Sequence, residues 1–276
     1  MKIDAHQHFW RYHPVEHAWI GDDMAALKRD YLPDDLQPDL RAAGFDGCVA
    51  VQASQSEAET DFLLNLAKRH PFIRGVVGWV DLRAEDAADR LAGFARNPLL
   101  RGIRHGLQDE PDDRFMLRPD FRRGLGYLKQ FGLCYDLLIH PKHLPVALEL
   151  VRAFPDQPFV LDHLAKPFVR EQRMAPWGED MRALAACSNV SCKLSGLVTE
   201  AVWGKWQPVD FRPYLDLALE AFGPDRLLIG SDWPVCRLSA SYGETMRLIT
   251  DYLHALSETE RAKITGLTAA RVYRLR

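Results

Sequence analysis

Residues 47–80, GCVAVQASQSEAETDFLLNLAKRHPFIRGVVGWV, contain the pattern that decides the fold. The first and last parts of this stretch, Gly47–Ala53 and Ile73–Val80, are short apolar runs typical of buried strands. The segment between them, Ser56–Arg69, has a helical pattern. Its opening serine, followed three positions later by a glutamate, is the signature of a capping box. The stretch therefore predicts one strand-helix-strand unit of a parallel sheet.

The same alternation extends along the whole chain. Strand-like runs are predicted at Ile3–Phe9, Gly47–Ala53, Ile73–Val80, Arg101–His105, Leu133–His140, Phe159–Leu164, Val190–Ser195 and Arg226–Ser231. Helical patterns are predicted at Asp34–Ala43, Ser56–Arg69, Glu85–Arg96, Pro119–Phe131, His143–Phe154, Pro176–Cys187, Asp210–Phe222, Ser241–Leu256 and Glu258–Arg274. Such alternation predicts an α/β fold, a (β/α)8 TIM barrel in one domain over residues 1–276, since these barrels usually take about 250 residues. The competing fold is a doubly wound open sheet, but no GxGxxG motif follows the first strand.

The composition is that of a soluble globular enzyme. Hydrophobic residues make up 47% of the chain, charged residues 26%, and the formal net charge is -3. This balance favours neither nucleic acid nor an anionic membrane surface as a partner. No apolar stretch approaches the roughly 20 residues that span a bilayer, and the N-terminus lacks the apolar core of a signal peptide. The five scattered cysteines form no CxxC pair, so we expect a cytoplasmic protein without a disulfide framework.

Histidines are concentrated at the ends of the predicted strands. His6 and His8 occupy alternate positions of the first strand, so both side chains face the same side of it. In a barrel of this kind, functional side chains gather at the C-terminal ends of the strands. Further candidates at strand ends are His105, His140, His163 and Asp232. The aspartate lies between Gly-Ser and Trp-Pro directly after an apolar strand, which suits a pocket better than a core.

Five motifs carry a resemblance to a known family. They are HQHFW at 6–10, RHGLQDE at 104–110, LDHLAKP at 161–167, CKLSGLVTE at 192–200 and GSDWPVC at 230–236. Together they resemble the amidohydrolase superfamily, and more closely its sugar-lactonase branch of L-fuconolactonases, L-rhamnonolactonases and pyrone-dicarboxylate lactonases. The resemblance implies a hydrolase that opens L-fucono-1,4-lactone or a related aldonolactone to the free acid. The partner would then be a small molecule, and the oligomeric state is left open.

The resemblance also implies a set of metal ligands. The positions that correspond to the superfamily's inner shell are His6, His8, His163 and Asp232. Binuclear members place a bridging carboxylated lysine or a glutamate on strand 4, where this chain has Arg104, and a guanidinium cannot bridge two cations. We therefore expect one divalent ion, with zinc first because its ligands are nitrogen and oxygen atoms. The alternative is action without metal, as in some members of the branch.

The remaining roles are assigned from chemistry. Asp232 is the candidate general base on water, with His163 as the second catalytic candidate. In the metal-free alternative, the histidines and Arg104 would donate hydrogen bonds to the developing oxyanion. His140 is either a further ligand or a polar residue at a strand end, and strand alternation predicts that Asp162 points away from the pocket. Candidates for contact with the substrate are Arg104, His105, Lys166, Trp10 and Trp233.

Two rival functions remain open at this point. Related barrels perform metal-dependent decarboxylation of an aromatic or unsaturated acid. A catalytically silent barrel that binds a sugar acid is the other possibility, although the presence of both strand-1 histidines and of Asp232 argues against it. The fold alone decides neither question, since barrels host unrelated chemistries.

Overall fold

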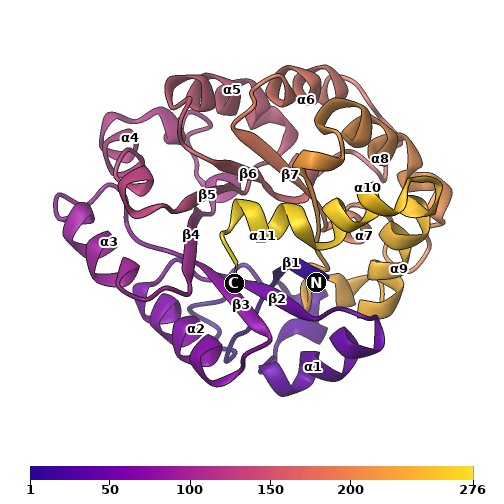
Figure 1. Ribbon diagram of the computed structural model, residues 1–276, viewed down its shortest axis with the longest axis horizontal. Coiled ribbons are helices and arrows are strands. Elements are labelled where there is room, and N and C mark those ends of the chain that lie inside the picture. Colours follow the sequence, from indigo (N-terminus) through magenta and orange to yellow (C-terminus); the bar gives the residue numbers. More distant parts are fainter. Residues whose placement is uncertain (276) are drawn as a thin grey trace.

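The computed structural model describes residues 1–275 and confirms the barrel (Figure 1). Eight strands form one sheet in the order β1 to β8, and every neighbouring pair is parallel. Because the spatial order equals the sequence order, each strand lies beside the next, and the helices cover the outside. The strands are β1 Ile3–Gln7, β2 Gly47–Val51, β3 Ile73–Gly78, β4 Leu100–His105, β5 Cys134–Leu137, β6 Phe159–Leu161, β7 Val190–Leu194 and β8 Leu227–Ile229.

The predicted helices are present, some of them in pieces. The α-helices are α1 Pro33–Ala42, α2 Glu57–Arg69, α3 Ala87–Ala95, α4 Pro119–Leu125, α5 Leu144–Ala153, α6 Trp177–Ala185, α7 Leu197–Glu200, α8 Pro208–Phe222, α9 Tyr242–Tyr252, α10 Glu258–Ala262 and α11 Thr268–Val272. The predicted final helix is one such case, because a π-helical segment, Lys263–Leu267, separates α10 from α11. The short helix α7 is absent from the predictions.

Several strands end earlier than their apolar runs predict. β6 ends at Leu161 and β8 at Ile229, although the predicted runs continue to Leu164 and Ser231. After β6 and after β8 the backbone soon enters the left-handed region. Such a turn breaks the ladder and changes the direction of the following side chains. The residues that leave the ladder are those expected to carry the chemistry.

The barrel closes between β1 and the segment that follows β8. The amide of His8 donates to the carbonyl of Trp233 at 2.7 Å, and the amide of Asp232 donates to the carbonyl of His6 at 2.8 Å. Gln7 and Trp233 form a parallel bridge at the same place. The two ends of the sheet therefore meet at the segments that carry the candidate site.

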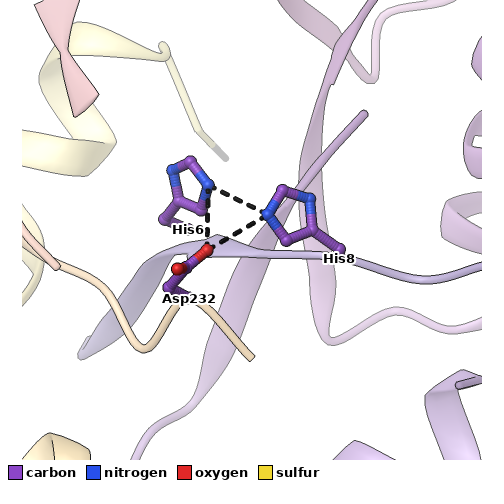
Figure 2. Close-up of side chains that lie close together, drawn as sticks. All are labelled: His6, His8 and Asp232. Atoms are coloured by element: carbon purple, nitrogen blue, oxygen red, sulfur yellow. Dashed lines mark hydrogen bonds and ion pairs between the residues drawn. The ribbon is translucent and has the colours of Figure 1, made fainter. Parts of the chain in front are cut away.

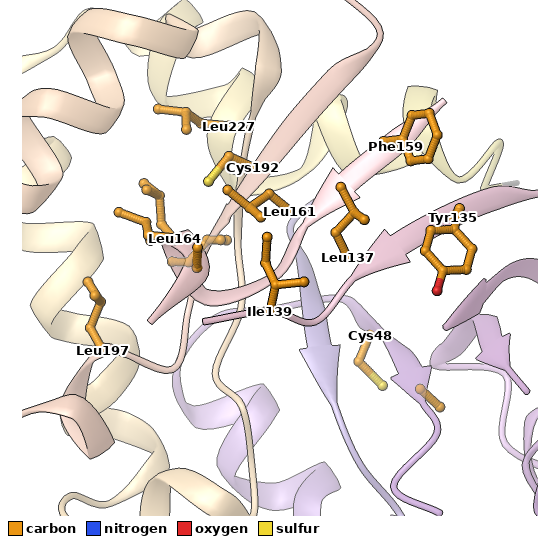
Figure 3. Close-up of a cluster of buried hydrophobic side chains, with 14 of the residues drawn as sticks. Cys48, Tyr135, Leu137, Ile139, Phe159, Leu161, Leu164, Cys192, Leu197 and Leu227 are labelled. Carbon is orange, nitrogen blue, oxygen red and sulfur yellow. The ribbon is translucent and has the colours of Figure 1, made fainter. Parts of the chain in front are cut away.

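The apolar residues form two cores. The larger core lies between the strands and the surrounding helices, and Figure 3 shows part of it, including Tyr135, Leu137, Phe159, Leu161 and Leu227. The smaller core fills the inside of the barrel with Ile3, Ala5, Val49, Val51, Val77, Cys134, Val160 and Leu228. Ala269 and Tyr273 pack against it, so α11 covers the end of the barrel near both termini (Figure 1).

All five cysteines are free in the structure, as expected. Among residues 1–275, no helix is both long and apolar enough to cross a membrane.

Gly124 in α4 tests how closely the outer layer packs. A Cβ at Gly124 would overlap the carbonyl group of Leu82, so Gly124→Ala should lower the free energy of unfolding by about 2 kcal/mol. Gly93 in α3 is the matched control, because a Cβ there meets nothing within 4 Å. Gly93→Ala should raise the free energy by roughly 0.5–1 kcal/mol, since alanine forms helices better than glycine. Chemical denaturation measures both effects. Equal changes in the two variants would contradict the packing that we describe.

Candidate active site

An irregularity in β1 directs both of its histidines into the barrel. The pairing register between β1 and β2 shifts between Asp4 and Gln7, so β1 contains one extra residue there. Ala5 lies in the inner core, and the extra residue allows His6, the next residue, to face inward as well. His8 follows two positions later on the same side. The alternation predicted from the sequence therefore holds for the two histidines but not for the strand as a whole.

The buried carboxylate of Asp4 ties β1 to the segment that carries Asp232. It accepts hydrogen bonds from the Ser231 hydroxyl at 2.6 Å, the Ser231 amide at 2.9 Å and the His6 amide at 3.1 Å. Burial raises the pKa of Asp4 to about 6, and the hydrogen bonds from Ser231 oppose that shift. Gly230 is required at this junction because a Cβ there would lie 2.8 Å from the Cβ of His6.

His163 reaches the site through an unusual backbone. His163 and the three residues after it, up to Lys166, all have positive φ, with 54° at His163. Strand alternation places Val160 in the inner core and Asp162 on the same inward side, so a regular strand would turn His163 outward. The left-handed backbone brings it inward instead, where its Nδ1 lies 2.8 Å from the Ser195 hydroxyl. Asp162 therefore faces the barrel interior and not the outside, contrary to the predicted alternation, although it is fully buried and does not line the pocket.

The three histidines and Asp232 converge on one point. Oδ1 of Asp232 lies 3.2 Å from Nε2 of His8, 3.6 Å from Nε2 of His6 and 3.7 Å from Nε2 of His163. The two Nε2 atoms of His6 and His8 are 3.2 Å apart. Figure 2 shows the rings of His6 and His8 turned toward the carboxylate. The structure thus brings together all four residues predicted as metal ligands.

This arrangement fits a single divalent metal ion. Ligand atoms around a tetrahedral zinc ion lie about 3.3 Å apart for bonds of about 2.0–2.1 Å, close to the separations among His6, His8 and Asp232, whose ligand atoms all lie within 4.8 Å of one another. His163 meets that limit together with His6 and Asp162 instead. Nδ1–H of His8 donates to the carbonyl of Val51 at 2.8 Å. Because a carbonyl only accepts, Nδ1 of His8 carries a proton, and Nε2, which lies 3.2 Å from Oδ1 of Asp232, is the ring atom that would bind a metal. A set of three imidazoles and one carboxylate is a donor set that zinc prefers.

Burial and mutual contact shift the pKa values of these groups. Burial opposes ionisation of Asp232, yet the neighbouring histidines, His163 foremost, hold its pKa below the ordinary value. Burial lowers the pKa of His163 to about 4, against the attraction of Asp232. Burial and then the charge of Lys193 keep the pKa of His6 well below its usual range. At neutral pH the site therefore combines an ionised carboxylate with neutral imidazoles at His6 and His163.

Arg104 enters the site from β4. Its guanidinium donates to the side-chain oxygen of Gln52 at 2.9 Å and to the backbone carbonyl of the same residue. It also donates to Asp162 at 3.0 Å and lies 3.3 Å from Nε2 of His6. These contacts fix the charge at the edge of the pocket, where it can interact with an anion or a polarised carbonyl.

A layer of buried charge lies beneath the histidines. Lys193 of β7 is fully buried, with Nζ 2.6 Å from Asp136, 2.8 Å from Asp162 and 3.1 Å from Nδ1 of His6. The hydroxyl of Tyr273, from the segment after α11, donates to Asp136 at 2.7 Å. Together with Arg104 the layer contains two cations and two carboxylates, so its formal charges cancel.

The site opens into a pocket of about 610 Å³. Of the predicted residues, the pocket is lined by His8, Arg104, His163, Lys166 and Asp232. Its walls include Trp19 and Trp203, whose indole N–H groups donate to backbone carbonyls at 3.0 Å, so their ring faces need no polar partner. Glu200 also lines the pocket, and burial raises its pKa against the attraction of Lys166.

Three residues predicted to contact the substrate lie elsewhere. Trp10 and Trp233 are core residues, 1% and 0% exposed, and both pack edge-on against Tyr31. His105 lies on the opposite face of β4 from Arg104, where it contacts Glu110 at 2.6 Å. Strand alternation gives the reason for His105, because adjacent residues of β4 face opposite sides. These placements correct the three predictions.

His140 lies outside the group of converging ligands. It lines an adjoining cleft of about 460 Å³ with Lys142 and Arg170, and this cleft shares Lys166 with the main pocket. Burial, and then the charge of Lys166, lowers the pKa of His140 to about 4. Of the two alternatives for His140, its position favours the polar strand-end residue over the further ligand.

Sequence reasoning missed the supporting residues, although one signal was available. Ser191, Lys193 and Ser195 alternate along a strand that is otherwise apolar, and this spacing marks an inward polar face on β7. Asp4 and Gln52 carry no comparable pattern. Their importance follows from contacts with segments far away in the sequence.

Comparisons with known proteins give a family and several similar proteins. The family model described as Amidohydrolase matches residues 3–275. An L-fucono-1,5-lactonase of Burkholderia multivorans is 46% identical over 286 residues, which cover 100% of this chain and 96% of the relative. An L-fucono-1,5-lactonase of Burkholderia ambifaria is 38% identical and covers 99% of this chain and 96% of its own length. The crystal structure of an amidohydrolase from Burkholderia multivorans with bound zinc is 45% identical, with a TM-score of 0.96 over 100% of both chains.

The buried layer predicts an effect on stability. Lys193→Met leaves Asp136 and Asp162 without their shared cation inside the barrel, so it should lower the free energy of unfolding by about 3–5 kcal/mol. Lys142→Met is the matched control, because Lys142 forms an equally short 2.6 Å pair with Asp113 on the exposed surface. It should leave stability unchanged, since solvent screens such pairs. Thermal denaturation of the two variants makes the comparison. Similar melting temperatures would contradict the role of the layer.

Proposed function

This chain belongs to the amidohydrolase family, and on that premise we propose that it opens a sugar-acid lactone with Asp232 as the general base. Full-length similarity to two lactonases supports hydrolysis of such a lactone. The first candidate substrate is L-fucono-1,5-lactone, since both relatives carry that name. The observation that carries the residue assignments is the convergence of three Nε2 atoms on Oδ1 of Asp232 at the floor of the pocket.

We assign one divalent ion, zinc, to the four converging residues. The spacing of His6, His8 and Asp232 and the chemistry of all four donors support this choice, as does the zinc bound by the 45% identical amidohydrolase. A zinc ion there would supply Lewis-acid activation of water and of the lactone carbonyl. His8 and His163 would hold it at the pocket side, while His6 would hold it from the fully buried side.

The protons are moved by Asp232. When water attacks the lactone carbonyl carbon, the carboxylate of Asp232 accepts a proton from the water. The bond between the carbonyl carbon and the ring oxygen then breaks, and Asp232 returns the proton to the leaving alkoxide. The product is the open hydroxy acid, and Asp232 is again ionised. One group performs both steps because it begins as a base and becomes an acid after the first transfer.

Arg104 supplies positive charge near the reacting carbonyl. Its guanidinium lines the pocket and is held by Gln52 and Asp162, so it can donate to the oxyanion without reorganising. In the metal-free alternative, this donor and the histidines would stabilise the oxyanion alone. The lowered pKa makes Asp232 a weak base in that case, which favours the metal-assisted reaction.

The walls of the pocket suit a sugar ring. Trp19 and Trp203 can lie against its C–H faces, because their N–H groups already have backbone partners. Glu200 and Lys166 provide an acceptor and a donor for hydroxyl groups. These residues take the place of Trp10, Trp233 and His105 as substrate contacts.

A panel of lactones tests the substrate class. We expect the purified enzyme to hydrolyse L-fuconolactone and lactones of matching stereochemistry, and to leave their epimers largely untouched. Proton release measured with a pH indicator reports turnover for 1,4- and 1,5-lactones of L- and D-sugar acids, with enzyme-free blanks. Chelator treatment should remove most of the activity, and added zinc should restore it. Hydrolysis that survives complete removal of metal would favour the metal-free route. If the enzyme hydrolyses none of the lactones in the panel, the proposed function is overturned.

The role of Asp232 has its own test. Asp232→Asn keeps the shape of the side chain but removes the base, so kcat for the best lactone should fall by at least about 100-fold. Metal analysis of the same preparation shows whether zinc is still bound. Glu200→Gln is the control, because it neutralises a pocket carboxylate that lies outside the converging group, and its effect should fall mainly on KM. Full activity of Asp232→Asn would exclude Asp232 as the base.

A further inference from the structure

His6 differs from the other two histidines in what its second nitrogen contacts. Nδ1 of His8 faces a carbonyl, which only accepts, and Nδ1 of His163 faces a hydroxyl, which donates or accepts. Nδ1 of His6 lies between a donor and an acceptor, with Nζ of Lys193 at 3.1 Å and Oδ1 of Asp162 at 3.3 Å. These two neighbours demand opposite tautomers. If Lys193 donates to Nδ1, the proton is on Nε2 and blocks that atom. If Asp162 accepts from Nδ1, the lone pair of Nε2 faces the site.

Nδ1 of His6 lies slightly closer to Nζ of Lys193, at 3.1 Å, than to Oδ1 of Asp162, at 3.3 Å, so it is the other contacts of Lys193 that favour Asp162. Lys193 already holds Asp136 at 2.6 Å and Asp162 at 2.8 Å, and both contacts are shorter than its contact with His6. Its charge is thus directed at the two carboxylates. Oδ1 of Asp162 makes a 3.3 Å ion-pair contact with Nδ1 of His6 and has no hydrogen bond among the described residues, so it has acceptor capacity left for that nitrogen. The carboxylate is held by two cations, Lys193 and Arg104.

Asp162 also keeps Arg104 away from the same ring. One guanidinium nitrogen of Arg104 donates to Oδ2 of Asp162 at 3.0 Å and lies 3.3 Å from Nε2 of His6. Without the carboxylate, this donor would have only the lone pair of His6 as an acceptor on that side. Asp162 therefore has two ways of leaving Nε2 free. It takes the proton of Nδ1, and it engages the neighbouring guanidinium.

We propose that Asp162 is a positioning residue that fixes the tautomer of His6 and so makes Nε2 available as a metal ligand. The inference rests on the metal site of the proposed function. It does not depend on which lactone is hydrolysed. Carboxylate partners of this kind change metal affinity by about 10–100-fold when they are removed from a histidine ligand.

Asp136 offers a matched control inside the same layer. It is as buried as Asp162 and pairs with the same lysine, but its other partner is Tyr273. Asp162→Asn and Asp136→Asn thus each remove one carboxylate from Lys193, and only the first removes the partner of His6. A purely structural role of the layer would affect the two variants alike.

The experiment measures zinc affinity and stability together. Metal-free wild type, Asp162→Asn and Asp136→Asn are titrated with zinc in competition with a chromogenic chelator, and their melting temperatures are recorded. We expect Asp162→Asn to bind zinc about 10–100-fold more weakly. Asp136→Asn should stay close to wild type in zinc affinity even if its melting temperature falls as far. Unchanged affinity in Asp162→Asn, or an equal loss in both variants, would overturn the proposal.

A second measurement does not depend on the folding of the Asp162→Asn and Asp136→Asn variants. Two-bond proton–nitrogen correlation spectra of wild type with ¹⁵N-labelled histidine distinguish the two ring tautomers, and His6→Gln assigns the signal. We expect His6 to carry its proton on Nδ1, both in the metal-free protein and after zinc is added. A proton on Nε2 in the metal-free protein would assign control to Lys193 and overturn the proposal. Failure to bind zinc at all would refute the metal site of the proposed function, and the metal-free spectrum would still decide the tautomer.

Discussion

Closure of the barrel is the constraint on which the rest of the structure depends. The amide of His8 binds the carbonyl of Trp233, and the amide of Asp232 binds the carbonyl of His6, so the first strand and the segment after the last strand meet residue by residue. Asp4 reinforces this seam through Ser231. Because the same segments carry two histidines and the aspartate, closing the sheet also assembles the site. The positions of His6 and His8 relative to Asp232 therefore follow from backbone pairing between β1 and the segment after β8.

The interior of the barrel changes character along its axis. Small apolar side chains and the aromatic ring of Tyr273 fill the end near the termini. Toward the other end lie Lys193, Asp136, Asp162 and Arg104, and above them the histidines. Burying four charges is costly unless they are paired at close range, and here each carboxylate has a cation within 3.0 Å. The layer therefore orients the site from below with groups that carry no net charge.

The backbone after β6 shows how strain and function coincide. His163 and the residues up to Lys166 adopt left-handed φ values, which cost roughly 1–2 kcal/mol for each non-glycine residue. The result is that Asp162 and His163, adjacent in sequence, both serve the same site, one through Nδ1 of His6 and the other through Asp232. In a regular strand, only one of these two adjacent side chains would face the barrel interior. The packed structure around the turn stabilises this strained backbone, as is common at functional sites.

The sequence by itself determined the eight strand-helix units, the barrel, the family and the four converging residues, because these follow from local periodicity and from motifs at strand ends. Only the tertiary structure decided which other residues contact these four and which line the pocket. His105 is excluded by strand alternation, and Trp10 and Trp233 by packing in the core. Asp162 faces inward although we predicted the opposite, since the left-handed turn after it was not visible in the sequence. Patterns along a chain report periodicity, whereas burial, tautomers and charge pairing depend on atoms contributed by segments distant in sequence.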